Sequence, residues 1–254
     1  MINNRLPYFV KKVLFGDRKR FGIIPEDSDR EWMIWQEKAV TDFYMRTQKK
    51  GLGNFVHNLS FSGLKEVDFS RKKVLEVGPG MIGHVKYIKS KPAKYVVCDI
   101  REEALQLAEE VLCLAEVPYE AILLNTDVGA ELPFVEESFD IIISFNSLEH
   151  LYPLDEYLLE VKRILKSGGQ LVGGIPCEGG LAWGLGRFLT TRRYVHKKYG
   201  INYDKIICWE HPNFADFIIE RLNRHFKRQH LRLQPFPWLP MDFNLIVSFV
   251  FGKG

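Results

Sequence analysis

Short apolar runs alternate with longer amphipathic stretches through the middle of this 254-residue chain. The apolar runs are rich in β-branched residues, which is typical of strands buried on both faces of a parallel sheet. Alternation of such strands with helices predicts a parallel α/β sheet covered by helices. We expect Gly168 and Gly169 to stop the last of these helices. Strands are expected near residues 73–77, 95–99, 120–124, 139–144 and 170–175, and helices near 83–90, 102–115 and 154–166.

Residues 1–70 predict a mostly helical N-terminal extension. One helix is expected from Glu31 to Lys49 and should end at Gly51. An aromatic stripe along it indicates either core packing or a lid over a binding site. The residues at helical spacing along this side are Trp32, Trp35, Ala39, Phe43 and Arg46, of which three are aromatic.

The part of the chain after the expected core at residues 71–176 divides into two segments. Residues 177–230 are longer than a simple crossover requires, and we expect this insertion on the substrate side of the molecule. Residues 231–254 contain two apolar runs, at 231–233 and 245–251. Their short separation predicts a hairpin that completes the sheet, with the last strand antiparallel to the rest.

The run from Val74 to Gly83 holds the most informative motif of the chain. A short apolar strand leads into Gly78-x-Gly80-x-x-Gly83, and glycines let a backbone turn tightly and approach a ligand because they lack a Cβ. The next apolar strand ends in Asp99, where an acid in a βαβ unit can accept hydrogen bonds from ribose hydroxyls. The sequence therefore predicts a pocket for an adenosine-containing cofactor at the carboxyl edge of the sheet.

Glu76 discriminates between two kinds of cofactor. Taken literally, the glycine pattern is the dinucleotide fingerprint and predicts a nicotinamide oxidoreductase. A nicotinamide cofactor brings a pyrophosphate to this turn, where a carboxylate is unfavourable, whereas S-adenosylmethionine brings an ammonium group and a sulfonium. Glu76 thus favours S-adenosylmethionine, and the alternative is an acid that only caps the following helix.

Further motifs follow in order: Asp127 to Phe134, Glu137 to Ser144, Leu148 to His150, and Leu165 to Val172. With the glycine motif, they make the chain resemble the class I S-adenosylmethionine-dependent methyltransferases, particularly the group that includes ubiquinone and menaquinone methyltransferases. The resemblance covers about residues 71–176. It implies a doubly wound, Rossmann-like and mostly parallel seven-stranded sheet whose last strand is antiparallel.

The resemblance also implies the cofactor contacts, position by position. The family usually has a third glycine at the position of Ile82, so the local shape of the turn is expected to differ. The implied contacts are Glu76, Gly78 and Gly80 at the methionine part, Asp99 at the ribose, Ile100 on the adenine, Asp127 and Val128 at the adenine amino group, and Ser144 and Asn146 beside the transferring methyl.

The candidate catalytic residues lie outside the cofactor motifs. Methyl transfer from a sulfonium is an in-line displacement that depends mostly on positioning, and an alcohol acceptor also needs a base. His150, just past the fourth strand, is the first candidate, with Glu149 orienting its ring, and His211 in the insertion is the second. A helix cap or a cofactor contact is the alternative for His150, and a loop-fixing role for His211. We expect no metal, because these residues and Glu210 lack ligand spacing.

The acceptor is predicted from the insertion. The Glu149-His150 pair and the segment from Trp209 to Pro212 are similar to bacterial methyltransferases of sugar and surface-polysaccharide synthesis. O-methylation of a sugar or glycan precursor is therefore the leading hypothesis. The alternatives are a small aromatic or quinone-like acceptor, and a catalytically silent scaffold that keeps the cofactor fold. A phosphorylated or nucleotide-linked sugar would suit the guanidinium groups of Arg187, Arg192 and Arg193.

Composition and charge indicate which partners and which cellular location to expect. A net charge of +3 and the lack of an RNA-binding module argue against a nucleic-acid partner. Four cysteines without metal-ligand spacing (Cys98, Cys113, Cys177 and Cys208) indicate a reduced, cytoplasmic protein. We see no membrane span and no signal peptide. Basic clusters at 11–12 and 18–20 allow peripheral contact with acidic lipid, although a solvated basic face is the simpler interpretation.

Overall fold

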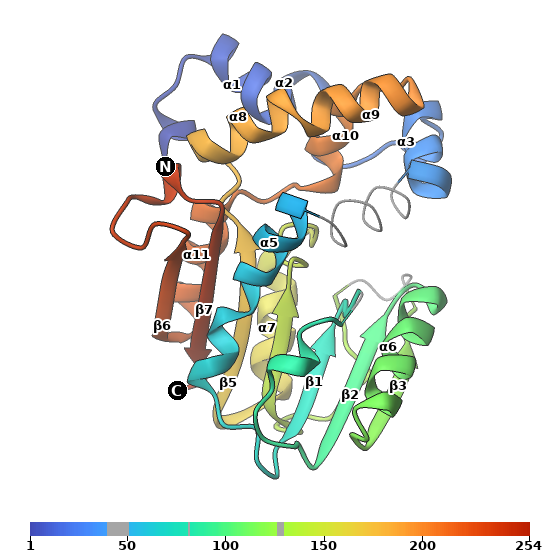
Figure 1. Cartoon of the computed structure of the whole chain (residues 1–254), viewed down its shortest axis with the longest axis vertical. Helices are drawn as coiled ribbons and strands as arrows, with labels where there is room; N and C mark the ends of the chain where they lie inside the picture. The colour runs from blue at the N-terminus through green and yellow to red at the C-terminus, as the bar shows by residue number, and fades with distance from the viewer. Residues whose placement is uncertain (40–50, 81, 126–129) are drawn as a thin grey trace.

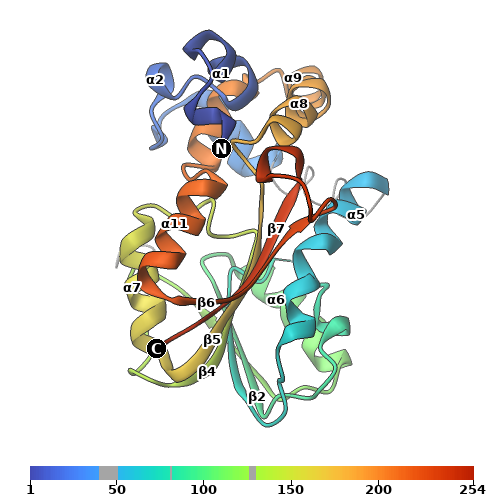
Figure 2. The ribbon, with the colours of Figure 1, turned by 90° about the vertical axis from the view of Figure 1, so that its left-hand side faces the viewer.

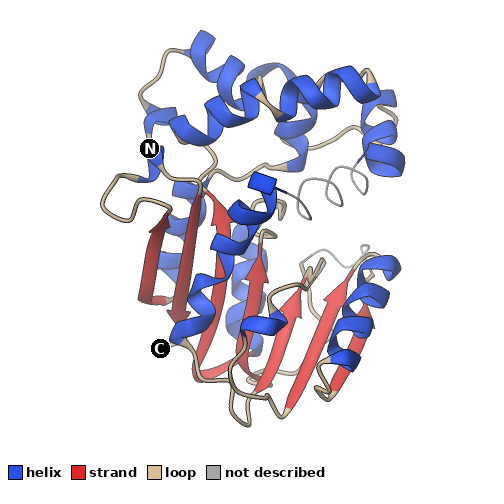
Figure 3. Ribbon diagram, viewed as in Figure 1, coloured by secondary structure: helices blue, strands red, loops and turns tan. Residues whose placement is uncertain are grey.

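A seven-stranded sheet forms the centre of the computed structural model, which describes residues 1–39, 51–80, 82–125 and 130–254 (Figure 1, Figure 3). The strands are β1 (Lys73–Val77), β2 (Lys94–Asp99), β3 (Tyr119–Leu123), β4 (Phe139–Phe145), β5 (Leu165–Pro176), β6 (Lys227–Gln234) and β7 (Ile246–Gly252). They lie in the order β3-β2-β1-β4-β5-β7-β6. The first five pair in parallel, and β7 is antiparallel to both of its neighbours. The predicted fold class is confirmed.

Helices cover both faces of the sheet (Figure 2). Neighbouring strand residues point to opposite faces, so Leu75 and Val74 belong to two separate hydrophobic clusters. The Leu75 face packs against α7 (Leu154–Ile164) and α11 (Ala215–His225). The Val74 face packs against α6 (Glu102–Leu114) and the 3₁₀ segment η3 (Ser60–Glu66), which continues α5 (Gly51–Leu59). Because helices cover both faces, a ligand can reach the sheet only at its edges and at the ends of its strands.

Helices α6 and α7 form where they were predicted, but the stop of α7 is different. Gly168 and Gly169 do not end it; they lie inside β5, with Gly168 at a φ of +74°. The helix ends at Ile164 because Glu137 N and Ser138 N donate hydrogen bonds to the carbonyls of Arg163 and Ile164. A neighbouring segment therefore satisfies the last turn, and no glycine cap is needed.

The helix predicted at 83–90 does not form. Only the 3₁₀ turn η4 (Val85–Tyr87) occurs between β1 and β2. Ile82, where the family usually has a glycine, is 2% exposed and has a φ of +44°. This left-handed conformation is unfavourable for a β-branched residue and turns the backbone away from a helix start.

A helical cap lies beyond the carboxyl ends of the parallel strands (Figure 1). It combines α1 (Tyr8–Phe15), α2 (Arg18–Phe21), α3 (Arg30–Ile34) and the π-helical η2 (Trp35–Ala39) with α8 (Leu181–Leu189), α9 (Thr191–Tyr199) and α10 (Tyr203–Glu210). Two further 3₁₀ turns are η1 (Ile2–Asn4) and η6 (Met241–Phe243). The first part of the N-terminal extension and the first part of the insertion thus build one body, whereas η3 and α11, from the later parts of the same two segments, pack on the sheet.

The aromatic stripe of the extension packs inside this cap. Trp35 is 1% exposed and lies in a cluster with Tyr203 and Ile206, while the Trp32 ring contacts the edge of the Trp209 ring. Packing therefore accounts for these two positions, and residues 40–50 lie outside the described residues. The predicted stop at Gly51 is wrong, because Gly51 begins α5.

The substitution Gly174→Ala tests how η3 seals the sheet. A Cβ at Gly174 would lie 2.5 Å from the Ser60 carbonyl oxygen, so we expect a loss of about 1–3 kcal/mol in unfolding free energy, measured by urea unfolding. The matched control is Gly186→Ala in α8, where a Cβ meets nothing within 4 Å and helix propensity favours alanine by up to about 1 kcal/mol. Equal stability of the two variants would contradict this packing.

Candidate functional site

The carboxyl ends of β1, β2 and β4 bring the predicted cofactor residues to one edge of the sheet. Gly78 and Gly80 follow β1 with φ of +67° and +53°, so both adopt a conformation that disfavours a side chain. A Cβ at Gly80 would meet no atom of the described residues within 4 Å. The loop therefore leaves space at its tip, as a ligand-binding turn requires.

Asp99 ends β2 beside this loop. Its side chain is 5% exposed, and Oδ1 accepts a hydrogen bond of 2.9 Å from Arg101 N. The neighbouring Ile100 is 58% exposed, which leaves an apolar surface at the strand end. A fixed carboxylate beside an open apolar side chain fits a ribose and its base. The other two predicted adenine contacts, Asp127 and Val128, lie outside the described residues.

Glu76 has protein partners, which the sequence did not predict. Its side chain is 1% exposed, and Oε2 accepts a 2.7 Å hydrogen bond from the Tyr95 hydroxyl. His84 Nε2 lies 3.2 Å from the same oxygen. Burial, then the charge of Glu76, raise the pKa of Tyr95 well above its usual value, so the hydroxyl remains a donor. The contacts with Tyr95 and His84 therefore hold Glu76 in place at the end of β1, just before the glycine loop.

The end of β4 is fixed by residues of the N-terminal extension. The Ser144 hydroxyl hydrogen-bonds that of Ser147, and Asn146 takes a φ of +50°. Asn146 Oδ1 accepts from Ser60 Oγ at 3.3 Å, and Nδ2 lies 3.4 Å from His57 Nδ1. Burial, followed by the charge of His84, lowers the pKa of His57 to about 4, so His57 accepts this hydrogen bond.

The structure brings the candidate catalytic histidines together. His150 follows β4 and His211 follows α10, yet their ring centroids are 4.6 Å apart at an angle of 86°. His150 Nδ1 donates a 2.7 Å hydrogen bond to the Glu210 carbonyl oxygen. The prediction that Glu149 orients this ring is wrong, because the backbone of Glu210 does so. Glu149 is 2% exposed, and its Oε2 has no hydrogen-bond partner among the described residues.

Glu178 and Arg18 complete this cluster, and sequence reasoning missed both. Glu178, 1% exposed after β5, accepts a hydrogen bond from His211 Nδ1. The Arg18 guanidinium lies 3.9 Å from Glu178 Oε1 and donates to the carbonyls of His211 and Pro212 at 2.7 and 2.8 Å. The sequence signal that could have identified Glu178 is its position just past the fifth strand, because the carboxyl ends of the parallel strands meet at this edge.

Burial and neighbouring charges shift the pKa values of His150, His211 and Glu149 in different directions. Burial, then the charge of His211, lower the pKa of His150 to about 4. Burial alone would lower the pKa of His211 as well, but the charge and hydrogen bond of Glu178 outweigh it and raise the value to about 9. Burial raises the pKa of Glu149 to about 7, despite the opposing effect of His211. At neutral pH the site thus pairs an uncharged His150 with a cationic His211.

Two arginines predicted to bind phosphate are engaged inside the cap. Arg187 is 5% exposed and donates to Asp204 Oδ1 at 2.8 Å and to the carbonyls of Val13 and Leu14. Arg192 donates to Asp204 Oδ2 at 2.7 Å. That prediction is wrong for Arg187, because an internal aspartate and helix-end carbonyls satisfy its buried guanidinium. For Arg192, whose side chain is 40% exposed, it stays a prediction. Arg193 remains exposed on α9.

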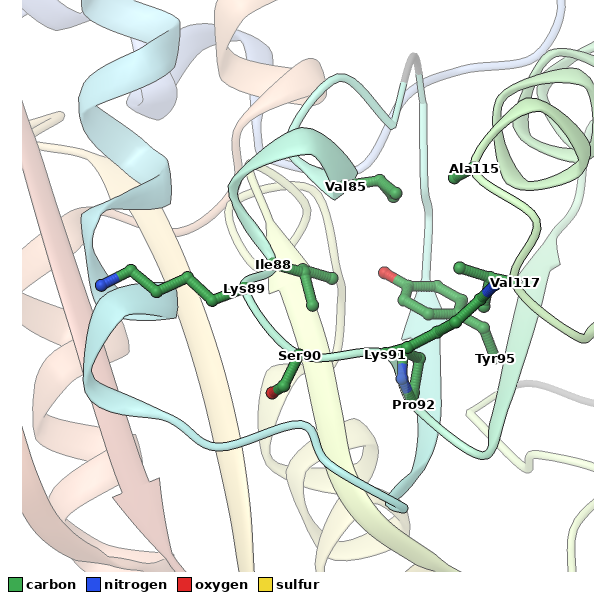
Figure 4. Close-up of a pocket in the computed structure, with 9 residues that line it drawn as sticks. All are labelled: Val85, Ile88, Lys89, Ser90, Lys91, Pro92, Tyr95, Ala115 and Val117. Atoms are coloured by element: carbon green, nitrogen blue, oxygen red, sulfur yellow. The ribbon is translucent and has the colours of Figure 1, made fainter.

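A cavity of about 230 Å³ lies apart from the predicted cofactor residues (Figure 4). It is formed between the η4 loop, with Ile88 and Lys91, and the chain after α6, with Ala115 and Val117. Tyr95 from β2 also lines it. In the described ranges, no group of three His, Cys, Asp or Glu side chains has the arrangement of a metal site. None of the helices in these ranges is both long and apolar enough for a membrane span.

Several curated proteins similar to this chain carry methyltransferase names. It is 31% identical over 121 residues to a fatty-acid O-methyltransferase of Mycolicibacterium smegmatis, a match that covers 46% of this chain and 42% of that protein. It is 32% identical over 117 residues to a phthiotriol/phenolphthiotriol dimycocerosates methyltransferase of Mycobacterium leprae, with coverages of 45% and 41%. The chain spans less than half the length of these relatives.

The fold is shared with solved methyltransferase structures. An S-adenosylmethionine-dependent methyltransferase from Thermotoga maritima aligns with a TM-score of 0.55 and 18% identity, over 89% of this chain and 100% of that one. The family model described as a methyltransferase domain matches residues 75–173, which contain β1 to β5 up to Gly173. Residues 75–173 therefore match a methyltransferase domain, and the chain shares the fold of S-adenosylmethionine-dependent methyltransferases.

Proposed function

We propose that this protein is an S-adenosylmethionine-dependent O-methyltransferase that methylates a hydroxyl oxygen held beside His150 and His211. The observation that carries the proposal is the hydrogen bond from His150 Nδ1 to the Glu210 carbonyl. A carbonyl oxygen only accepts, so Nδ1 carries the proton of the neutral ring and the lone pair is on Nε2. A hydroxyl placed at Nε2 therefore meets a base.

The charge of His211 keeps His150 unprotonated in the resting site, and the same charge makes His150 a weaker base. With a pKa of about 9, its ring is an imidazolium at neutral pH, and a second cation at 4.6 Å is unfavourable. His150 therefore stays unprotonated until the acceptor hydroxyl releases its proton. Glu178, buried behind His211, holds that charge in place.

The edge of the sheet orients the reactants. When bound, S-adenosylmethionine supplies a methyl group on a positively charged sulfur. Asp99 would hold the ribose, Gly78 and Gly80 the methionine part, and the β4 end at Ser144 and Asn146 the side nearest the methyl group. His150 would take the hydroxyl proton as the acceptor oxygen bonds to the methyl carbon and the bond from that carbon to sulfur breaks, leaving a neutral thioether. Positioning of this kind supplies most of the rate enhancement in such displacements.

For the acceptor we favour a hydroxylated fatty-acyl or polyketide-like lipid. The support is that the similar curated proteins carry fatty-acid or phthiotriol dimycocerosates methyltransferase names. The hypothesis of a sugar or glycan precursor has lost one of its three supporting arginines, since Arg187 is buried and bound to Asp204. Two alternatives stay predictions: an aromatic or quinone-like acceptor, and a catalytically silent scaffold. A cytoplasmic location also stays a prediction, and its support is that all four cysteines are free thiols.

Asp99→Ala tests the cofactor assignment. Losing a carboxylate that accepts from two ribose hydroxyls should weaken S-adenosylmethionine binding by about 10- to 100-fold, measured by isothermal titration calorimetry. Glu103→Gln, an exposed acid in the first turn of α6, is the matched control and should bind normally. Unchanged affinity of Asp99→Ala would remove Asp99 from the cofactor site.

His150→Ala tests the base. In an assay of labelled methyl transfer from S-adenosylmethionine, a hydroxylated fatty acid, a nucleotide sugar and a quinol are offered separately. We expect label in the lipid, and we expect His150→Ala to lower kcat by about 10²- to 10⁴-fold with little change in cofactor affinity. The exposed His196→Ala is the control.

The outcomes of this assay separate the hypotheses. Label in the nucleotide sugar or in the quinol would replace the lipid by that acceptor. Cofactor binding without transfer to any of the three would favour the scaffold. Full turnover by His150→Ala would show that the acceptor needs no base, and His150 would then be structural.

Glu178→Gln tests the charge on His211. The folded pKa of His211, about 9, exceeds the ordinary 6.5, so the wild type holds this stabilisation below pH 6.5 and loses it as pH rises to about 9. The loss should reach up to about 3 kcal/mol of unfolding free energy, measured by urea unfolding at both pH values. In Glu178→Gln, the unfolding free energy should fall much less between these pH values. The control is Glu137→Gln, at an exposed glutamate, which should show the same fall as the wild type. An identical pH dependence in Glu178→Gln and wild type would contradict the pairing.

A further inference from the structure

Helix α1 presents an apolar face to solvent at the end of the molecule farthest from the sheet (Figure 1, Figure 2). Phe9 is 66% exposed, Tyr8 40% and Val13 39%. Phe9 and Val13 are four residues apart and so lie on one side of the helix. The opposite side is buried through Leu14 and Phe15. Tyr8, Phe9 and Val13 therefore expose apolar surface together on one short helix.

This helix is held firmly against the cap. Phe15 and Leu14 pack so closely on α8 that a Cβ at Gly184 would lie 2.7 Å from the Phe15 ring. Arg187 donates hydrogen bonds of 2.8 and 2.9 Å to the carbonyls of Val13 and Leu14, at the end of α1. The exposed face is therefore presented by a fixed element, with its orientation set by buried contacts.

Positive charge surrounds this face. Residues 1–24 contain six Lys or Arg and one acid, Asp17, which leaves 29 Lys or Arg against 31 Asp or Glu in the rest of the chain. The excess positive charge of the protein thus resides in this segment. Lys12 is exposed on α1 itself, and Lys19 Nζ lies 4.6 Å above the Tyr8 ring. Arg5 and Arg20 are exposed as well.

We propose that α1 docks this protein on an anionic lipid bilayer. Phe9 and Val13 would enter the boundary between headgroups and acyl chains, while Lys12, Lys19 and Arg20 pair with lipid phosphates. The charge of the segment selects this occupant, because an apolar groove of a protein partner would leave these cations without counter-charges. The inference depends only on this surface and holds whichever acceptor is methylated.

Arg18 connects the segment that carries the docking surface to the candidate active site. Arg18 lies between the exposed Lys19 and the site, where it donates to the carbonyls of His211 and Pro212. Docking through α1 would thus set the helical cap against the bilayer. An acceptor that resides in the membrane would then need to travel only the thickness of the cap.

Vesicle co-sedimentation of the full chain tests the proposal. We expect binding to vesicles of phosphatidylcholine with about one third phosphatidylglycerol, weak binding to phosphatidylcholine alone, and release on raising the salt concentration. Phe9→Ser with Val13→Ser should weaken the partition coefficient by about tenfold or more. Lys12→Gln with Lys19→Gln should do so by a similar factor.

Matched controls distinguish docking from a general change in surface. Leu114→Ser removes another exposed apolar side chain, 86% exposed at the end of α6, and Lys65→Gln removes an exposed cation on η3; both should bind like wild type. Absence of wild-type binding to anionic vesicles would overturn the proposal, as would unchanged binding of the α1 variants. Dissociation of a dimer by Phe9→Ser with Val13→Ser, without vesicle binding, would assign the face to a second copy of the chain.

Discussion

The buried ion pair between Glu178 and His211 joins the sheet to the helical cap. Glu178 follows β5 and His211 follows α10, and both lie below the surface. Arg18 brings the N-terminal extension to the same point through the carbonyls of His211 and Pro212. Breaking a buried pair leaves an uncompensated charge and costs about 3–5 kcal/mol. The position of the cap over the sheet edge therefore depends on this contact.

The same edge contains a second set of buried polar groups. Glu76, Tyr95 and His84 form hydrogen bonds beneath the glycine loop, and Asn213 Nδ2 donates to the carbonyls of Leu148 and Leu151 in the loop after β4. A satisfied buried network specifies one geometry, because each broken bond would leave a desolvated group. The loops that would hold the cofactor and the acceptor are thus fixed before either binds.

The methyltransferase domain and the features that distinguish this protein occupy different parts of the chain. The family match ends at residue 173, before Glu178, His211 and the cap helices α8 to α10. Helix α1 precedes it. The shared core thus contains the predicted cofactor edge and leads through β5 to Glu178, whereas the cap contributes His211 and the basic apolar surface. Function specific to a protein commonly resides in such additions to a common fold.

Local sequence determined the strands, two of the core helices and the placement of Asp99, Glu76 and His150 at one edge, because apolar periodicity and strand ends depend on near neighbours. Tertiary structure decided which side chains meet. Glu178 and His211 are 33 residues apart, Arg187 turns inward to Asp204, and the segment after Ile82 does not become a helix. Such pairings depend on how distant segments pack, and no local pattern carries that information.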